Sequence, residues 1–146
     1  MIRVAGMLVA LTFGALSLLH LYWAAGGRFG GGAVVPTVGG RRTFHPSPLG
    51  TILVAIALLV AMLIVLGRLG LLGGAIPRRV FRWGTCGIAV IFLLRAVGDF
   101  RLVGFFKRVN GSSFAYWDTW LFSPLCLAIA AVAFALVYSE IREVPR

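Results

Sequence analysis

The chain is organised as long apolar runs separated by segments rich in glycine, proline and arginine. Residues 4–25 carry no formal charge, and the same holds for residues 49–67 and 119–139. Each run is about as long as the roughly 20 apolar residues that a helix needs to cross a bilayer. Because backbone groups in lipid must bond to one another, helices are the expected spanning elements. The pattern therefore predicts three membrane helices directly.

A further span is expected between Arg82 and Asp99, although Arg95 interrupts it. The uncharged stretch from Trp83 to Leu94 would form only about 18 Å of helix. That is too short for a hydrocarbon layer of roughly 30 Å, so Arg95 should lie in the membrane or near its edge. We predict an all-α polytopic membrane protein with a single domain, 1–146, in which four transmembrane helices form an antiparallel bundle, at about 3–25, 49–68, 79–99 and 119–140.

Two long connections are expected on the same side of this bundle. Residues 26–48 are rich in glycine and proline, which forbids a continuous helix, yet they also carry apolar side chains. We expect this loop to lie over the end of the bundle. Residues 100–118 form a basic-aromatic loop, as is typical of the membrane interface. Pro124 should kink the first turns of the last helix.

Composition agrees with a membrane protein and excludes a soluble enzyme, since 60% of the residues are hydrophobic and only 12% are charged. The net charge of +10 mainly reflects arginines that flank the spans. Basic residues are divided between the two sides, so nucleic acid is not an expected partner. Seven basic residues against six weakly favour both termini on the cytoplasmic side of a bacterial inner membrane.

Polar residues inside the spans gather near the side that holds the long loops. His20, Arg95 and Ser123 are each expected within about 10 Å of that edge. Arg95 and Asp99 are four residues apart, which places them on one helical face and predicts an ion pair. The pair either neutralises a buried arginine or forms part of a functional site. Asp118 is expected as the N-cap of the fourth helix.

His20 is the second candidate feature of this cluster. It could act as an acid or base, or hydrogen-bond a ligand together with Tyr22 and Trp23; alternatively it is an interfacial residue without chemistry. Neither a cofactor nor a metal is expected, since two cysteines and two histidines in these positions do not form a metal-ligand pattern. The candidate catalytic residues are His20 and Asp99, and the candidate ligand-binding residues are Arg95, Asp99, His20, Tyr22, Trp23 and Ser123.

Several short motifs together resemble a family of small bacterial four-helix membrane proteins that is catalogued as a domain of unknown function. The motifs are LHLYWAAGG at 19–27, VP at 35–36, RAVGDFR at 95–101, GFFK at 104–107, FAYWDT at 114–119 and SPLC at 123–126. The resemblance covers nearly the whole chain. It implies the architecture and a bacterial membrane location, but no activity.

Three functions are compatible with these features. The first is binding of an amphipathic or anionic ligand, such as a membrane lipid or lipid-like small molecule, at the polar cluster, with proton-transfer chemistry of the isomerase or cyclase type. The second is an accessory or scaffolding subunit, in which small-residue faces such as Gly6, Ala10 and Gly14 dock a membrane protein partner or another copy. The third is a small oligomeric transporter.

Overall fold

In the computed structural model, which describes residues 1–38, 41–43 and 45–139, most of the chain is helical. The long helices are α1 (Ile2–Ala24), α3 (Pro48–Arg68), α4 (Arg78–Val97) and α6 (Ser123–Tyr138). Between α1 and α3 lie a short helix, α2 (Gly31–Val34), and two paired antiparallel strands, β1 (Thr37–Val38) and β2 (Arg41–Arg42). Helix α5 (Ser113–Trp117) leads into α6 through a π-helical turn, Asp118–Phe122.

The prediction of an all-helical membrane protein with four spans is confirmed. Among the described residues, four helices are long and apolar enough to cross a membrane, the last of them being the continuous helical segment Ser113–Tyr138. The first three spans begin and end within two residues of their predicted bounds. The predicted end of the fourth helix at residue 140 and the arginines at 142 and 146 lie outside the described residues.

The predicted start of the fourth helix, at residue 119, is wrong. Helical structure begins at Ser113, and the hydroxyl of Ser112 accepts a hydrogen bond from Ala115 N at 3.0 Å, which caps this helix. Asp118 therefore lies inside the helical segment and is not its N-cap. Serine satisfies free backbone donors as well as aspartate does, so a cap at Ser112 leaves Asp118 available for other partners.

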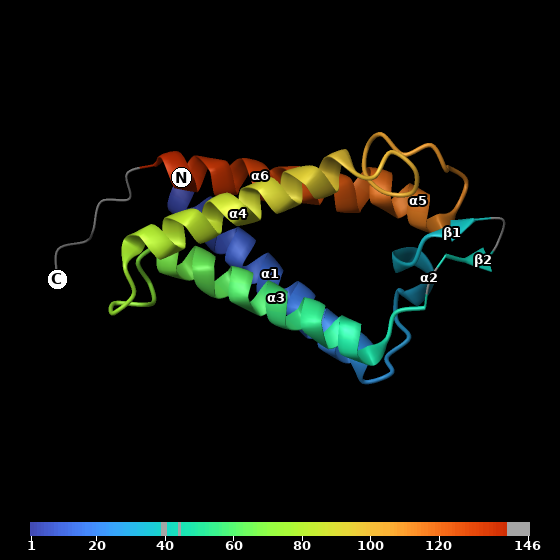
Figure 1. The fold of residues 1–146 in the computed structure, drawn as a ribbon, viewed down its shortest axis with the longest axis horizontal. Helices are drawn as coiled ribbons and strands as arrows, with labels where there is room; N and C mark the ends of the chain where they lie inside the picture. The colour runs from blue at the N-terminus through green and yellow to red at the C-terminus, as the bar shows by residue number, and fades with distance from the viewer. Residues whose placement is uncertain (39–40, 44, 140–146) are drawn as a thin grey trace.

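The four spans form two pairs, α1 with α3 and α4 with α6 (Figure 1). The pairs meet at the end that holds the N-terminus, the α3–α4 turn and the end of α6, which we call the turn end. They diverge toward the end that holds α2 and α5, which we call the loop end (Figure 1). Because the pairs separate in this way, the antiparallel bundle as such stays a prediction.

Close packing joins the two pairs at the turn end. The buried core here includes Phe13, Val65, Leu69, Ile129 and Leu136. A methyl group on Gly6 would lie only 3.0 Å from the side chain of Leu69 and 3.2 Å from that of Leu136. The small residues of α1 thus serve contacts within the chain, since Gly6 lets α1 approach α3 and α6 closely.

The loop between α1 and α3 reaches across the loop end. Trp23 Nε1 donates a hydrogen bond to Phe29 O at 2.7 Å, and Val35 and Pro36 are buried. Helix α2 packs against α5, so this segment connects the α1–α3 pair with the helix that leads into α6 (Figure 1). Residues 39, 40 and 44 of the predicted loop lie outside the described residues.

Candidate functional site

A fully buried carboxylate, Asp118, lies at the centre of the polar groups of the loop end. Its Oδ1 accepts a hydrogen bond from Arg95 Nη2 at 2.8 Å. Its Oδ2 accepts from Gly104 N at 2.8 Å and from Lys107 Nζ at 3.1 Å. A buried carboxylate needs such partners, because an unpaired charge in this environment is very costly. We call Arg95, Lys107, Asp118 and Thr119 the Asp118 cluster.

Lys107 is the most completely satisfied cation of the cluster. Its ammonium donates to Asp118 Oδ2, to Gly104 O at 3.1 Å and to Thr119 Oγ1 at 2.6 Å. These three bonds use all three donors of a lysine. Only 2% of the side chain is exposed. Lys107 therefore ties the loop that follows α4 to the π-helical turn, and it has no donor left for a ligand.

The loop that carries Lys107 is shaped by Asp99. Asp99 Oδ1 accepts hydrogen bonds from the backbone N–H groups of Arg101, Leu102 and Val103, at 3.0, 2.7 and 2.9 Å. These bonds to the ionised form hold the pKa of the Asp99 carboxyl below its ordinary value. The predicted Arg95–Asp99 ion pair is thus wrong: Asp99 lies beyond the end of α4 and bonds its own loop instead.

Two glycines allow the loop to turn back onto α4. Both Gly98 and Gly104 have a φ of +89°, in the left-handed region that favours glycine. A methyl group on Gly98 would overlap the carbonyl oxygen of Val103, and one on Gly104 would overlap that of Val97. This close backbone approach brings Gly104 N and Lys107 to Asp118.

Arg95 and Ser123 each keep an unused polar atom in this region. Arg95 Nη1 and Ser123 Oγ are buried and have no hydrogen-bond partner among the described residues. The Arg95 side chain is still 33% exposed, unlike those of Lys107 and Asp118. Buried polar atoms are normally paired, so two unpaired ones near a charged cluster are unusual and call for an explanation. Among the three charged members of the cluster, Arg95 is thus the one that a ligand could reach.

The backbone next to Asp118 is irregular. The N–H of Ser123 bonds to Asp118 O, five residues back, instead of the usual four. Pro124 follows directly and has no N–H to give to the preceding turn. The expected disturbance of the helix before Pro124 therefore takes the form of a π-helical turn. Such turns occur frequently at functional sites.

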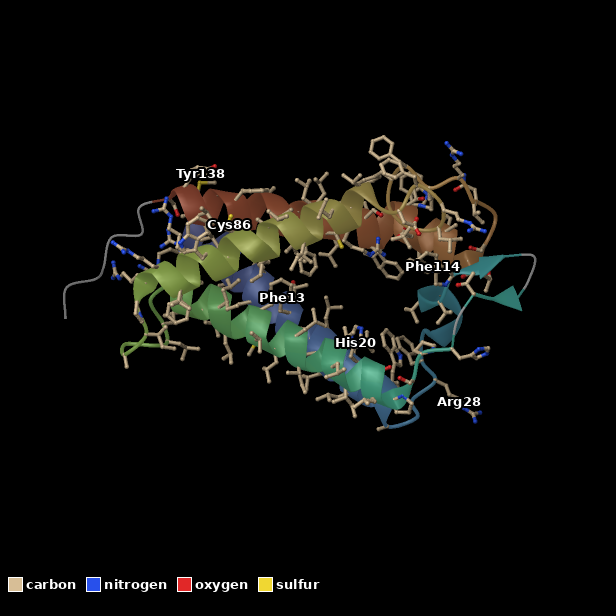
Figure 2. The ribbon with its side chains drawn as sticks, viewed as in Figure 1. Phe13, His20, Arg28, Cys86, Phe114 and Tyr138 are labelled. Atoms are coloured by element: carbon tan, nitrogen blue, oxygen red, sulfur yellow. The ribbon has the colours of Figure 1, made fainter. Side chains whose placement is uncertain are left out.

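His20 belongs to a separate group on α1. Its Nδ1 lies 2.8 Å from Leu16 O and donates to it, since a carbonyl oxygen only accepts, so Nε2 takes no part in this bond. The ring contacts Trp23 at a centroid distance of 5.0 Å, and Trp23 in turn holds Phe29. Figure 2 shows His20 on α1 on the side of the space that separates the two helix pairs. Tyr22 is half exposed, and its carbonyl accepts from Gly27 N at 2.9 Å.

The structure thus divides the predicted site residues into two groups. Arg95 and Ser123 lie with the Asp118 cluster, whereas His20, Tyr22 and Trp23 lie at the end of α1. No hydrogen bond, ion pair or ring contact between described residues joins the groups. Sequence reasoning missed the roles of Lys107 and Asp118. The one available signal was the scarcity of acidic residues, since a buried arginine must find one of very few carboxylates.

The possible metal-ligating side chains are dispersed in the described part of the chain. No three His, Cys, Asp or Glu side chains there lie close enough to hold an ion. Cys86 and Cys126 are both free thiols. The polar groups at the loop end are guanidinium, ammonium, carboxylate, hydroxyl and imidazole groups, which suit hydrogen bonding and charge pairing.

Comparison with known proteins bears on this description. No curated protein and no solved structure matches the chain. One family model does, and it covers residues 13–133, which include His20, Arg95, Lys107, Asp118 and Ser123. The matched region holds both polar groups of the loop end and most of the four spans. The chain therefore belongs to the family described as "Protein of unknown function (DUF3995)".

Proposed function

We propose that this membrane protein binds a singly charged anionic amphiphile at its loop end, with the charged group on Arg95. The observation that carries the proposal is the unpartnered, buried Nη1 of Arg95 beside a cluster with an excess of positive charge. Two cations share a single carboxylate, so the cluster carries one net positive charge. An anion at Arg95 would neutralise it.

The different hydrogen bonding of the residues in the Asp118 cluster supports this proposal. Lys107 is buried and fully bonded, so it holds Asp118 in place and does not need a ligand. Asp118 uses one oxygen to orient Arg95. The guanidinium of Arg95 then presents its second nitrogen in a fixed direction, and bidentate or paired guanidinium contacts are the strong means of recognising carboxylates and phosphates. Ser123 Oγ would add a neutral hydrogen bond.

The apolar part of the ligand would lie between the two helix pairs, toward α1. His20, Tyr22 and Trp23 would contact it there, and Nε2 of His20 is available for a hydrogen bond. If the protein is an enzyme, His20 is the acid or base of a proton transfer on a lipid-like substrate, of the isomerase or cyclase type. Asp99 is less suited to that role, because its carboxylate is engaged by three backbone N–H groups.

The second candidate is an accessory or scaffolding subunit. It is favoured by the completeness of the Lys107 and Asp118 bonds, which would also suit a purely structural link between the loop and the helix. Under this hypothesis the unpaired Arg95 nitrogen has no role in binding small molecules. The two hypotheses therefore differ in what Arg95 and Ser123 do.

We also propose that the protein resides in a bacterial cytoplasmic membrane with both termini inside. The resemblance of its motifs to a bacterial family supports the location. The seven-to-six excess of basic residues on the side that the sequence predicts to hold both termini supports the orientation. Fusions of a cytoplasmic fluorescent reporter and a periplasmic phosphatase to each terminus test it. Phosphatase activity at either terminus would contradict the proposed orientation.

Oleate and oleyl alcohol provide a matched pair of probes for ligand binding, since they differ in charge and share the chain. We expect the purified protein in mild detergent to bind oleate and not the alcohol. Arg95→Lys keeps the bond to Asp118 but removes the second nitrogen, so oleate should bind about tenfold more weakly. Ser123→Ala removes an unpaired hydroxyl without breaking a hydrogen bond, and it should lower the affinity for oleate about fivefold.

Arg108→Gln is the control, since Arg108 is exposed on the same loop and outside the cluster. It should leave the affinity for oleate unchanged. Equal binding of oleate to all three variants and the wild type, with thermal stability preserved, would contradict the ligand-binding proposal and favour the structural role.

A further inference from the structure

Four arginines surround one pocket at the turn end, opposite the Asp118 cluster. The pocket has a volume of about 420 Å³, and its described lining comprises Arg68, Arg78, Arg79, Arg82 and three residues at the end of α6. None of these lining residues is acidic. We propose that this pocket binds the phosphate groups of an acidic phospholipid, as a site separate from the proposed ligand site at the loop end.

Arg68 forms the fixed side of this pocket. Its Nη2 donates to Leu136 O at 2.7 Å and to Ser139 O at 2.8 Å, at the C-terminal end of α6. These two bonds to carbonyls at the end of α6 orient the guanidinium, and Leu136 O also accepts from Ser139 Oγ at 3.1 Å. Its Nε is buried and has no hydrogen-bond partner among the described residues. An oriented guanidinium with an unused donor is well prepared for an anionic oxygen.

The other three arginines come from the first turns of α4. Arg79 and Arg82 lie in the first two turns of this helix, which has no acidic residue in its first turn. Cations at a helix N-terminus are unfavourable, because the free N–H groups there already carry partial positive charge. Repulsion among the guanidinium groups of Arg68, Arg79 and Arg82 adds to this cost. A phosphate would relieve both, since helix N-termini and arginines each favour anions.

The position of the pocket favours a lipid over a soluble phosphate. Arg68 ends one span and Arg78 begins the next, which places the pocket at headgroup level. Tyr138 lines the pocket and is 80% exposed, and Trp83, next to Arg82, is 73% exposed. Exposed tyrosine and tryptophan at the ends of spans are typical of the membrane interface. Figure 2 shows nitrogen-bearing side chains gathered near Tyr138 at this end of the molecule.

The number of charges favours a headgroup with more than one phosphate. A phosphodiester carries one negative charge, whereas Arg68, Arg79 and Arg82 alone bring three positive charges to the pocket. Cardiolipin carries two phosphodiesters on one molecule, so its negative charge matches the positive charge of the pocket better than that of phosphatidylglycerol does. Basic pockets between membrane helices are known to bind such headgroups. The expected order of affinity is cardiolipin, then phosphatidylglycerol, with phosphatidylcholine not retained.

The test is native mass spectrometry of the full chain in mild detergent with each of the three lipids. The double variant Arg79→Gln and Arg82→Gln removes two exposed cations and leaves the bonds of Arg68 to α6 intact. At about fivefold per arginine, we expect the double variant to bind cardiolipin about 30-fold more weakly than the wild type. The control is Arg101→Gln with Arg108→Gln, which removes the same charge from the exposed surface of the loop end. It should change cardiolipin binding less than about twofold.

Two results would overturn the proposal. One is an equal loss of cardiolipin binding in both double variants, since that would reflect net charge alone. The other is displacement of cardiolipin by millimolar inorganic phosphate at unchanged ionic strength, since the pocket would then be a site for free phosphate. Oleate binding serves as an internal reference: if it fails in the wild type while cardiolipin binds, the loop-end proposal fails and this one stands.

Discussion

Lys107 Nζ lies 3.1 Å from Asp118 Oδ2, and both side chains are almost completely closed to solvent. The two residues come from different elements, a loop and a π-helical turn, so this contact joins the end of α4 to the start of the last span. Arg95 shares the same carboxylate through its other oxygen. This buried acid thus links α4, the loop after it and the π-helical turn, and the first prediction concerns it.

Replacing Asp118 with Asn should destabilise the protein by about 3–5 kcal/mol, because Lys107 would be left buried without a counter-charge. Lys107→Met should lower the free energy of unfolding by less than Asp118→Asn does, because Asp118 keeps Arg95 as a partner. The double variant should therefore cost less than the sum of the two single changes. Thermal unfolding of the four proteins in one detergent measures this coupling, and additive effects would contradict a direct interaction.

The hydrogen bonds of the Asp99 carboxylate predict that the stability of the protein depends on pH. Its pKa is lowered in the folded protein by the backbone N–H groups of Arg101, Leu102 and Val103. The stabilisation is therefore complete above the ordinary pKa of 3.8 and is lost as the pH falls through the folded pKa. The difference in melting temperature between wild type and Asp99→Asn should be present at pH 6 and shrink toward pH 3.

The comparison between these two proteins isolates Asp99, since Asp118 titrates in both. Because Asp99 is exposed, we expect a modest effect at pH 6. A difference in melting temperature that stays constant from pH 6 to pH 3 would mean that the charge of Asp99 does not stabilise its loop.

Gly98→Ala should disrupt the loop after α4. The substitution forces a side chain into a left-handed conformation, at a φ of +89°, and against the Val103 carbonyl. We expect a loss of at least about 2–3 kcal/mol, from the backbone strain and the steric overlap together. Gly87→Ala is the matched control on α4, because nothing lies within 4 Å of the added methyl group. Melting temperatures that fall equally in both variants would contradict the specific role of Gly98.

Trp23→Phe should loosen the segment between α1 and α3 without unfolding the protein. The change removes the hydrogen bond from Nε1 to Phe29 O, worth about 1 kcal/mol, and keeps most of the apolar surface. Amide hydrogen exchange over residues 28–37 should then become about fivefold faster. Trp83→Phe, at an exposed position on α4, should leave that exchange unchanged. Equal exchange rates in the two variants would contradict the prediction that the Trp23 hydrogen bond stabilises the segment between α1 and α3.

The sequence accounts for the four spans and most of their bounds, since length and hydropathy are local properties of the chain. Ranges such as Pro48–Arg68 follow from an apolar run that begins after proline and ends at arginine. The start of the last span was less predictable. Ser112 and Asp118 are both good N-caps, and nothing in the local pattern separates them.

The partners of Arg95 could not be read from the sequence for a related reason. Spacing on one helix favoured Asp99, four residues away, but the helix ends at Val97 and Gly98 turns the chain aside. That turn directs Asp99 to its own loop and brings Lys107 back toward Asp118. The clustering of Arg95 and Ser123 at one end was predictable from depth alone; their separation from His20 was not.

By itself, then, the sequence determined that the chain is an all-helical membrane protein with a polar loop end and a buried arginine. Insertion of a helix into a bilayer depends on the length and hydrophobicity of each apolar run, and both are local properties of the sequence. Only the tertiary structure decided which acid pairs with Arg95, which cations share it and which polar atoms remain unpaired. Those relations join residues distant in sequence, such as Arg95 and Asp118, and depend on backbone turns whose direction is settled by packing.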